Sequence, residues 1–178
     1  LVFEDAELKK AVEKCALSRW LNTGQSCIAA KRIIVVDSIY QEFLEQFLTF
    51  ARQYDYIDPL IRSSNGFFVG PMARLDLRDQ LAKQVRESVN LGARCELGGQ
   101  IPDRKGAYYP VTVLSKVTPG MPAFDQELFG PVATIIRAKD DRHAIELANK
   151  TTYGLGAALF TKSAVRIAQY PTLLQVGN

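Results

Sequence analysis

Two hydrophobic spacings recur along this chain, one typical of buried strands and one typical of amphipathic helices. Short apolar or β-branched runs predict strands at residues 31–36, 94–97, 108–114, 132–137 and 155–160. Apolar residues three and four positions apart predict helices at about 8–17, 41–48, 75–91, 141–148 and 164–170. Strands that alternate with helices indicate an α/β fold, here a three-layer αβα sandwich around a mostly parallel sheet.

Polar residues ahead of three of these stretches predict where the helices begin. Asp5 can cap the first helix, and Ser38 with Gln41 has the spacing of a capping box. Asp140 or Asp141 can cap the helix that follows the strand at 132–137.

The stretch 57–70 follows neither spacing and contains Pro59, Asn65 and Gly66, so we predict a loop there. No internal repeat or low-complexity linker divides the chain. We therefore predict a single domain over residues 1–178.

Composition agrees with one ordinary domain and argues against nucleic acid and membranes as its partners. The 178 residues are 47% hydrophobic, and 22 Lys plus Arg against 19 Asp plus Glu give a net charge of +3. Such a chain can bury a core, and it has no run of one charge sign that would attract nucleic acid or an anionic membrane. No apolar stretch approaches the roughly 20 residues of a membrane helix, and the first residues lack the features of a signal peptide. We expect no nucleic acid, no membrane and a cytoplasmic location.

The cysteines and the histidine limit the chemistry. Cys15, Cys27 and Cys95 are an odd number of thiols without a C-x-x-C pair, which argues against a disulfide framework. His143 is the only histidine and cannot complete a Cys/His metal cluster, so we expect no metal. Cys15 and Cys95 lie in apolar helical and strand patterns and are interpreted as packed residues.

Cys27 is a candidate nucleophile. It follows the glycine-containing segment 22–26 and precedes a predicted strand. A turn can expose a thiol and surround it with backbone amides, which favour the thiolate and stabilise an adjacent oxyanion. A small buried cysteine in a loop is the alternative interpretation of the same residues.

Glu127 and Phe129 form a second candidate group, just before the turn that Gly130-Pro131 fixes. Residues two apart share a side of an extended segment, so a carboxylate and a ring would be offered together, as a ribose beside a flat ring requires. A solvated glutamate and a core phenylalanine are the alternative. The chain contains neither a G-x-G-x-x-G after a strand nor a phosphate-binding G-x-x-x-x-G-K-[ST].

Taken together, the two segments resemble motifs of the NAD(P)-dependent aldehyde dehydrogenases. Residues 20–27 resemble the family's cysteine signature, and Glu127-Leu128-Phe129-Gly130-Pro131 resembles its E-x-F-G-P motif. Further similar stretches are 70–74, 109–114, 153–155 and 176–178. The similarity runs over nearly the whole chain, and the branch that it resembles most is that of the succinate-semialdehyde dehydrogenases.

The resemblance implies an aldehyde substrate, NAD or NADP as coenzyme, and a role for each motif. Cys27 would attack the aldehyde as a thiolate, with its own backbone N–H as one oxyanion donor, and form a thiohemiacetal. Hydride loss would leave a thioester, which water hydrolyses to the acid. Glu127 would accept hydrogen bonds from the nicotinamide ribose, and Phe129 would pack beside the nicotinamide.

The resemblance also implies that parts of the family's site lie outside these residues. The family's general-base glutamate, in an E-L-G-G segment, precedes a stretch like residues 1–6. Residues 96–99 also read E-L-G-G, but they follow the cysteine, so Glu96 is not assigned as the base. We expect residues 1–178 to be the catalytic domain without the dinucleotide-binding domain and the oligomerisation segment, inactive alone, from a full-length homodimer or homotetramer.

Neither the aldehyde nor the choice between NAD and NADP follows from the motifs. A carboxylate-binding arginine cannot be chosen among Arg19, Arg32 and Arg137 by sequence. Two other functions also stay open. One is a truncated module with only a structural or interaction role, and the other is an acylating thiol enzyme such as a thiolase, for which His143 would be the single available histidine.

Overall fold

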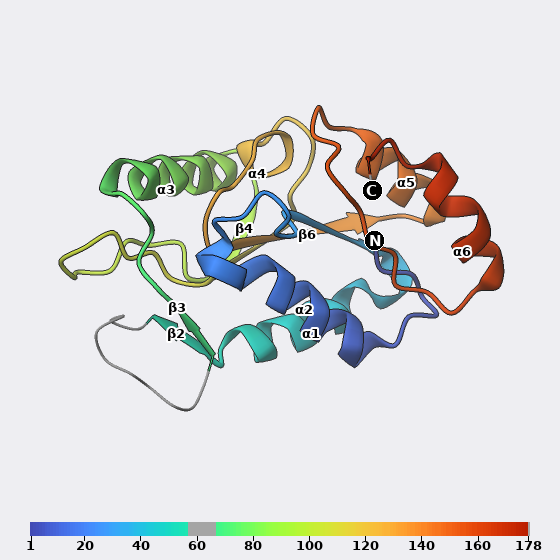
Figure 1. Ribbon diagram of the computed structural model, residues 1–178, viewed down its shortest axis with the longest axis horizontal. Coiled ribbons are helices and arrows are strands. Elements are labelled where there is room, and N and C mark those ends of the chain that lie inside the picture. The colour runs from blue at the N-terminus through green and yellow to red at the C-terminus, as the bar shows by residue number, and fades with distance from the viewer. Residues whose placement is uncertain (57–66, 178) are drawn as a thin grey trace.

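The computed structural model describes residues 1–56 and 67–177, and it is built around a four-stranded sheet (Figure 1). The strands are β1 (Arg32–Val36), β4 (Arg94–Leu97), β5 (Thr112–Ser115) and β6 (Val132–Ala138), in the spatial order β1-β6-β5-β4. β1, β6 and β5 run parallel, and β4 is antiparallel at the edge. Two further strands, β2 (Tyr54–Tyr56) and β3 (Phe67–Val69), pair in parallel in a small separate sheet.

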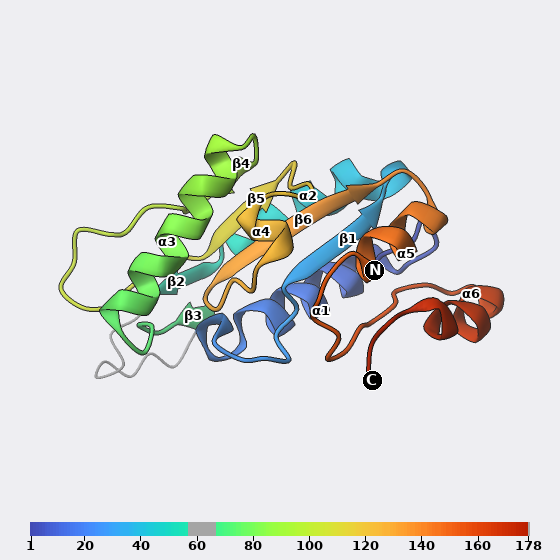
Figure 2. The same ribbon diagram turned by 90° about the horizontal axis from the view of Figure 1, so that it is seen from above.

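Helices cover both faces of the main sheet. In Figure 1, α1 (Leu8–Trp20) and α2 (Asp37–Ala51) lie below it, whereas α3 (Leu75–Asn90), α4 (Pro122–Asp125) and α5 (Asp141–Asn149) lie above. The turn η1 (Leu21–Gly24) extends α1, and the chain closes with α6 (Ala164–Gln169) and η2 (Tyr170–Leu173) at one end of the molecule, as Figure 2 shows. The predicted three-layer αβα sandwich with a mostly parallel sheet is confirmed.

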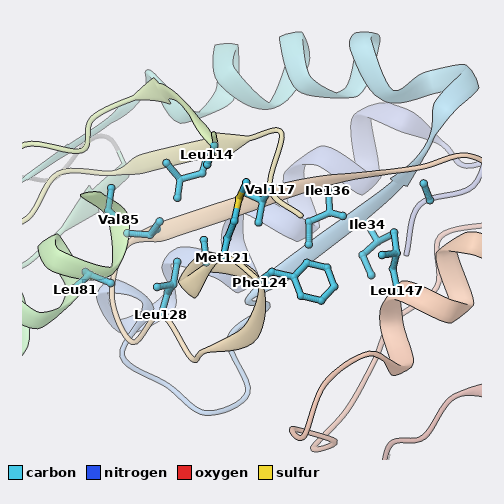
Figure 3. Close-up of a cluster of buried hydrophobic side chains, with 14 of the residues drawn as sticks. Ile34, Leu81, Val85, Leu114, Val117, Met121, Phe124, Leu128, Ile136 and Leu147 are labelled. Atoms are coloured by element: carbon cyan, nitrogen blue, oxygen red, sulfur yellow. The ribbon is translucent and has the colours of Figure 1, made fainter. Parts of the chain in front are cut away.

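Alternation along β1 explains the two apolar layers. Ile33 and Val35 belong to the cluster that α1 and α2 cover, and Ile34 and Val36 belong to the cluster on the opposite face. Figure 3 shows this second cluster, where side chains from α3, β5, α4 and β6 converge. Burying a large aliphatic or aromatic side chain contributes about 1.5–3 kcal/mol, so β1 with both faces buried anchors the helices on each side of it.

One of the three predicted helix caps is confirmed and two are wrong. Asp140 caps α5 by accepting a hydrogen bond from the N–H three residues later. The chain passes from β1 directly into α2 at Asp37, so Ser38 lies inside the helix. Asp5 does not cap α1, because its carboxylate accepts hydrogen bonds from Thr161 Oγ1 and from the Lys162 N–H, both at 2.8 Å.

Two strand predictions and one loop prediction also need correction. The strand predicted at 155–160 is reduced to a single bridge between Phe160 and Val2, because residues 153–158 are exposed and pair with no described strand. The strand predicted at 108–114 begins only at Thr112. Within the predicted loop 57–70, residues 67–69 form β3, and residues 57–66 lie outside the described part of the chain.

Candidate active site

Cys27 is exposed in the connection between η1 and β1. The preceding residues Asn22, Thr23 and Gly24 all have left-handed backbone conformations, with φ of 52°, 58° and 71°. Two successive non-glycine residues of this kind cost backbone energy and are held in place only where surrounding contacts fix them. Because Cys27 is exposed, the alternative of a small buried cysteine is wrong.

Side-chain hydrogen bonds fasten this strained connection, the Cys27 loop (residues 22–30), to the segment 70–73. The Gly70 N–H donates to Thr23 Oγ1 at 3.0 Å, and Thr23 Oγ1 in turn lies 3.3 Å from the Gly70 carbonyl oxygen. The Ala73 N–H donates to Gln25 Oε1 at 2.8 Å. Thr23 and Gln25, on either side of Gly24, are thus both bound to the segment 70–73.

Gly24 also touches the turn of the second motif. A Cβ placed on Gly24 would lie 2.1 Å from the carbonyl oxygen of Gly130, a distance that no real side chain tolerates. Only a residue without a Cβ allows this approach. The structure therefore brings the cysteine segment and the E-x-F-G-P segment, about a hundred residues apart in sequence, into direct backbone contact.

Arg19 lies fully buried beneath the Cys27 loop. Its Nη2 donates to the Gly24 carbonyl at 2.6 Å, and its Nη1 donates to the Ala30 carbonyl at 3.1 Å, so the guanidinium joins the two ends of the loop. Its Nε finds no hydrogen-bond partner among the described residues. Burial lowers the pKa of Arg19 to about 10, and the charge of Glu127 acts in the opposite direction.

Lys31 joins the two motifs from the other side. Its Nζ lies 3.2 Å from Glu127 Oε1 and 5.4 Å from the centre of the Phe129 ring. Glu127 and Phe129 are 35% and 39% exposed, whereas Leu128 between them is buried. The two residues predicted to share a side of an extended segment therefore both face Lys31, at the surface beside the Cys27 loop.

The comparison with protein families identifies the family of this chain. The sequence profile described as "Aldehyde dehydrogenase family" matches residues 1–178. This chain belongs to the aldehyde dehydrogenase family. The E. coli K12 protein "Succinate semialdehyde dehydrogenase [NAD(P)+] Sad" is 45% identical over 178 residues, all of this chain but 38% of that protein. "Succinate-semialdehyde dehydrogenase [NADP(+)]" of Deinococcus radiodurans is 38% identical over 99% of this chain and 36% of its own length.

Solved structures give the same family. The crystal structure of lactaldehyde dehydrogenase from Escherichia coli superposes with a TM-score of 0.94 at 31% identity, over 99% of this chain and 36% of that one. The glyceraldehyde-3-phosphate dehydrogenase GapN from Methanocaldococcus jannaschii, complexed with NADP, gives 0.90 at 30% identity, over 99% and 37%. The chain thus spans little more than a third of the length of the proteins that it matches.

In this member of the aldehyde dehydrogenase family, the other two cysteines have surroundings different from those of Cys27. Cys15 is buried in α1 as predicted, and burial raises the pKa of its thiol to about 11. Cys95 is exposed, so its assignment as a packed residue is wrong. It lies on the edge strand β4, where its Sγ is 3.4 Å from the Leu97 carbonyl oxygen, and desolvation raises its pKa.

The arginines that sequence could not rank all make contacts with other parts of the fold. Arg32 donates to the last carbonyls of α5, those of Leu147 and Ala148, both at 2.9 Å. Arg137 pairs with Asp37 at the surface. These two arginines are thus engaged in structural contacts within the described residues, and Arg19 supports the Cys27 loop.

Glu96 and His143 do not contact the Cys27 loop or the E-x-F-G-P segment in any of the hydrogen bonds that they make among the described residues. Glu96 is on β4, at the opposite edge of the sheet from β1, where it accepts a hydrogen bond from Ser115 Oγ. His143 lies in the first turn of α5, and its Nδ1 accepts from the Lys139 N–H at 3.0 Å. Neither cluster of metal ligands nor a membrane-spanning helix is found in residues 1–56 and 67–177.

Sequence reasoning missed Lys31, and it named Arg19 only among three arginines that it could not rank. Each is a single cation near the cysteine segment, and a cation at such a position is normally interpreted as a solvated charge. The available signal was their location, since Arg19 ends the apolar face of α1 and Lys31 directly precedes the buried run of β1. A charge next to two buried segments has to find acceptors in the protein.

Proposed function

We propose that this chain is the catalytic domain of an aldehyde dehydrogenase that oxidises an aldehyde to the carboxylic acid with NAD or NADP, and that Cys27 is its nucleophile. The observation that carries the proposal is the contact between Gly24 and Gly130, since the segment with the exposed Cys27 thus meets the segment that contains Glu127 and Phe129. Membership of the family supports it.

In the proposed reaction, the Cys27 thiolate attacks the aldehyde carbon, and the C–S bond forms as the carbonyl π electrons move onto oxygen. The Cys27 N–H stabilises this oxyanion. Collapse of the oxyanion to a carbonyl expels the hydrogen with its electron pair, leaving a thioester on Cys27. Water then displaces the thiolate and releases the acid, so the difficult oxidation is divided into two easier steps.

The residues present fit the coenzyme. Lys31 engages Oε1 of Glu127, and the carboxylate remains about one-third exposed, beside an exposed Phe129 ring. A carboxylate next to a ring offers acceptors to a ribose and a packing surface to the adjoining nicotinamide. The coenzyme, when bound, supplies the hydride acceptor. Glu127 would orient its ribose, and Phe129 would limit the position of the flat ring.

Succinate semialdehyde is the substrate that we propose. Its support is the similarity to proteins named succinate-semialdehyde dehydrogenases, the E. coli protein among them at 45% identity. Among the described residues, Lys31 and Arg19 are cations that bind the Cys27 loop, and both are already engaged in those contacts. We expect the distal carboxylate of this substrate to be recognised by residues outside this chain.

Thiol reactivity tests the nucleophile directly on this chain. Alkylation by iodoacetamide at about pH 7, followed peptide by peptide with mass spectrometry, should modify Cys27 much faster than Cys95. Because both thiols are exposed, a difference between their rates cannot be explained by accessibility to the reagent. Cys15 should react only after denaturation. Equal, slow modification of Cys27 and Cys95 would instead support a folded module without catalysis.

Turnover tests the reaction. We expect a protein of the full length of the relatives, carrying this sequence, to form NADH or NADPH from succinate semialdehyde, and Cys27→Ser to abolish this activity. The 178 residues alone should form none, because the matched relatives are more than twice as long. Coenzyme reduction by the isolated chain, or by the C27S variant, would contradict this part of the proposal.

A further inference from the structure

Lys31 has an unusual set of contacts for a lysine at the start of a strand. Its Nζ lies 2.5 Å from the Ser26 carbonyl oxygen and 3.1 Å from that of Ala29, in addition to the 3.2 Å contact with Glu127 Oε1. An ammonium has three N–H donors and no acceptor. All three donors of Lys31 therefore have an acceptor, two of them in the Cys27 loop and one in the E-x-F-G-P segment.

The two carbonyls lie on either side of Cys27, one residue before it and two residues after it. A single cation thus draws together both ends of the turn that presents the thiol. The side chain of Lys31 is only 18% exposed, and its Nζ also lies over the face of the exposed Phe129 ring. Removing a strongly hydrated ammonium from water is costly, so these contacts have to replace its hydration.

We propose that Lys31 is a positioning residue that ties the Cys27 loop to Glu127 and supplies the positive charge that favours the Cys27 thiolate. This inference rests on the proposed function, because it assigns a purpose to the neighbours of the nucleophile. It differs from the role of Arg19, which binds the loop carbonyls of Gly24 and Ala30 from beneath and lies fully buried.

The charges that face Lys31 come from three segments. They are Arg19 of α1, Cys27 of the loop and Glu127 after α4. Burial lowers the pKa of Lys31, and Arg19 lowers it further, whereas Glu127 and the Cys27 thiolate act to raise it. Because Lys31 Nζ binds carbonyl groups on both sides of Cys27, its positive charge lies close to the point where a thiolate would form and would attract it.

The first test measures alkylation of Cys27 in the 178-residue chain as a function of pH, with Cys95 of the same molecule as internal reference. Lys31→Gln removes the charge and keeps a donor for the loop carbonyls, and Lys31→Arg keeps the charge. At about pH 7, K31Q should slow alkylation of Cys27 by about threefold or more, and K31R should stay within about twofold of the parent. Lys14→Met, at an exposed position of α1, should change nothing.

The pH dependence separates charge from structure. Near pH 10 an ordinary thiol is almost wholly ionised, so the rates of K31Q and the parent should converge there if Lys31 acts through its charge. Equal rates at pH 7, or a loss of the same size at both pH values, would overturn the electrostatic role. If Cys27 of the parent protein reacts no faster than Cys95, the proposed function itself fails. If Cys27 reacts fast and its rate does not change in K31Q, only the role of Lys31 fails.

The second test concerns the tie between the loop and Glu127. Stability measured by urea denaturation for K31Q, Glu127→Gln and the double variant forms a double-mutant cycle. Because removing either partner breaks the same ion pair, the double variant should lose less stability than the two single variants added together. Strict additivity would show that Lys31 and Glu127 are not coupled and would overturn the positioning role.

Discussion

Gly24 and Gly130 approach so closely that a Cβ on Gly24 would meet the Gly130 carbonyl oxygen at 2.1 Å. The contact is made by backbone alone, and it determines how far the Cys27 loop stands from Glu127. No adjustment of a flexible side chain can relieve a clash at this point. The geometry of the candidate site therefore depends on two residues that have no chemistry of their own.

Substituting Gly24 should be among the most destabilising single changes in the chain. Gly24→Ala would force a residue with φ of 71° to carry a Cβ against a carbonyl, and we expect a loss of about 2–5 kcal/mol in the free energy of unfolding. Gly120→Ala is the matched control, since Gly120 also has positive φ, 95°, but nothing lies within 4 Å of its would-be Cβ. Urea denaturation of both variants measures the difference, and an equal loss would show that the clash is relieved without cost.

Gly130 should behave differently, because its obstacle is a side chain. A Cβ on Gly130 would lie 2.3 Å from Leu81 Cδ2. Gly130→Ala should cost about 1–3 kcal/mol and Leu81→Ala about 2–5 kcal/mol. Since shortening Leu81 makes room for the new methyl group, the double variant should be more stable than the sum of the single losses predicts. Additive losses would mean that Gly130 is restricted by something other than Leu81.

Arg19 should be needed for stability as well as for the loop. Arg19→Met removes the donors to the Gly24 and Ala30 carbonyls, and unsatisfied buried acceptors cost about 1–3 kcal/mol each. We expect a total loss of about 2–4 kcal/mol, measured by chemical denaturation. Arg142→Met, which breaks an exposed pair with Glu146, should cost less than about 1 kcal/mol. A similar loss in both variants would contradict the special position of Arg19.

Stability should fall in acid through Asp5. Desolvation acts to raise the pKa of this carboxyl, but hydrogen bonds from Thr161 and Lys162 and the charge of Arg166 outweigh it and hold the pKa below its ordinary value. A depressed carboxyl pKa stabilises the fold above the unfolded-state value of about 3.9, and this contribution is lost as pH falls through the lower folded-state value. Urea denaturation between about pH 7 and pH 3 should show a shallower decline in Asp5→Asn than in the parent.

The matched control for Asp5 is Glu13→Gln, an exposed acid on α1. It should leave the pH dependence of stability as it is in the parent. An unchanged slope in D5N would contradict the assignment of this acid-sensitive contact, in which Arg166 also pairs with Glu4 and Asp141.

The layers of the fold could be predicted because a strand that is buried on both faces has an almost continuous apolar sequence. The run 32–36 is apolar at nearly every position, and β1 is indeed buried on both faces. The failures have a common physical cause, which is competition by distant partners. Asp5 is of a residue type that often caps helices, but its carboxylate binds Thr161 and Arg166 instead of the N-terminus of α1. Residues 155–160 have strand composition, but residues 153–158 are exposed and the segment forms only the single bridge between Phe160 and Val2, so it does not become a strand.

The candidate site was predictable in its motifs and not in its supports. Cys27, Glu127 and Phe129 stand out because their neighbours form recognisable segments. Arg19 and Lys31 do not, since their importance comes from carbonyl groups, which every residue carries. Cys95 shows the reverse error, because an apolar strand pattern was taken for burial when the strand lies at the sheet edge.

The parallel pairing of β1 with β6 has a consequence for folding kinetics. Thr134 Oγ1 donates to the Lys31 carbonyl across 103 positions of sequence, and the register of the two strands extends this long-range pairing from Arg32 to Val36. Pairing between distant segments has to overcome loop-closure entropy before it gains contacts, which slows folding. The thiol and the carboxylate lie on the two segments that close this long loop. The site should consequently assemble late, so that the fast reactivity of Cys27 would appear only when β1 and β6 have paired.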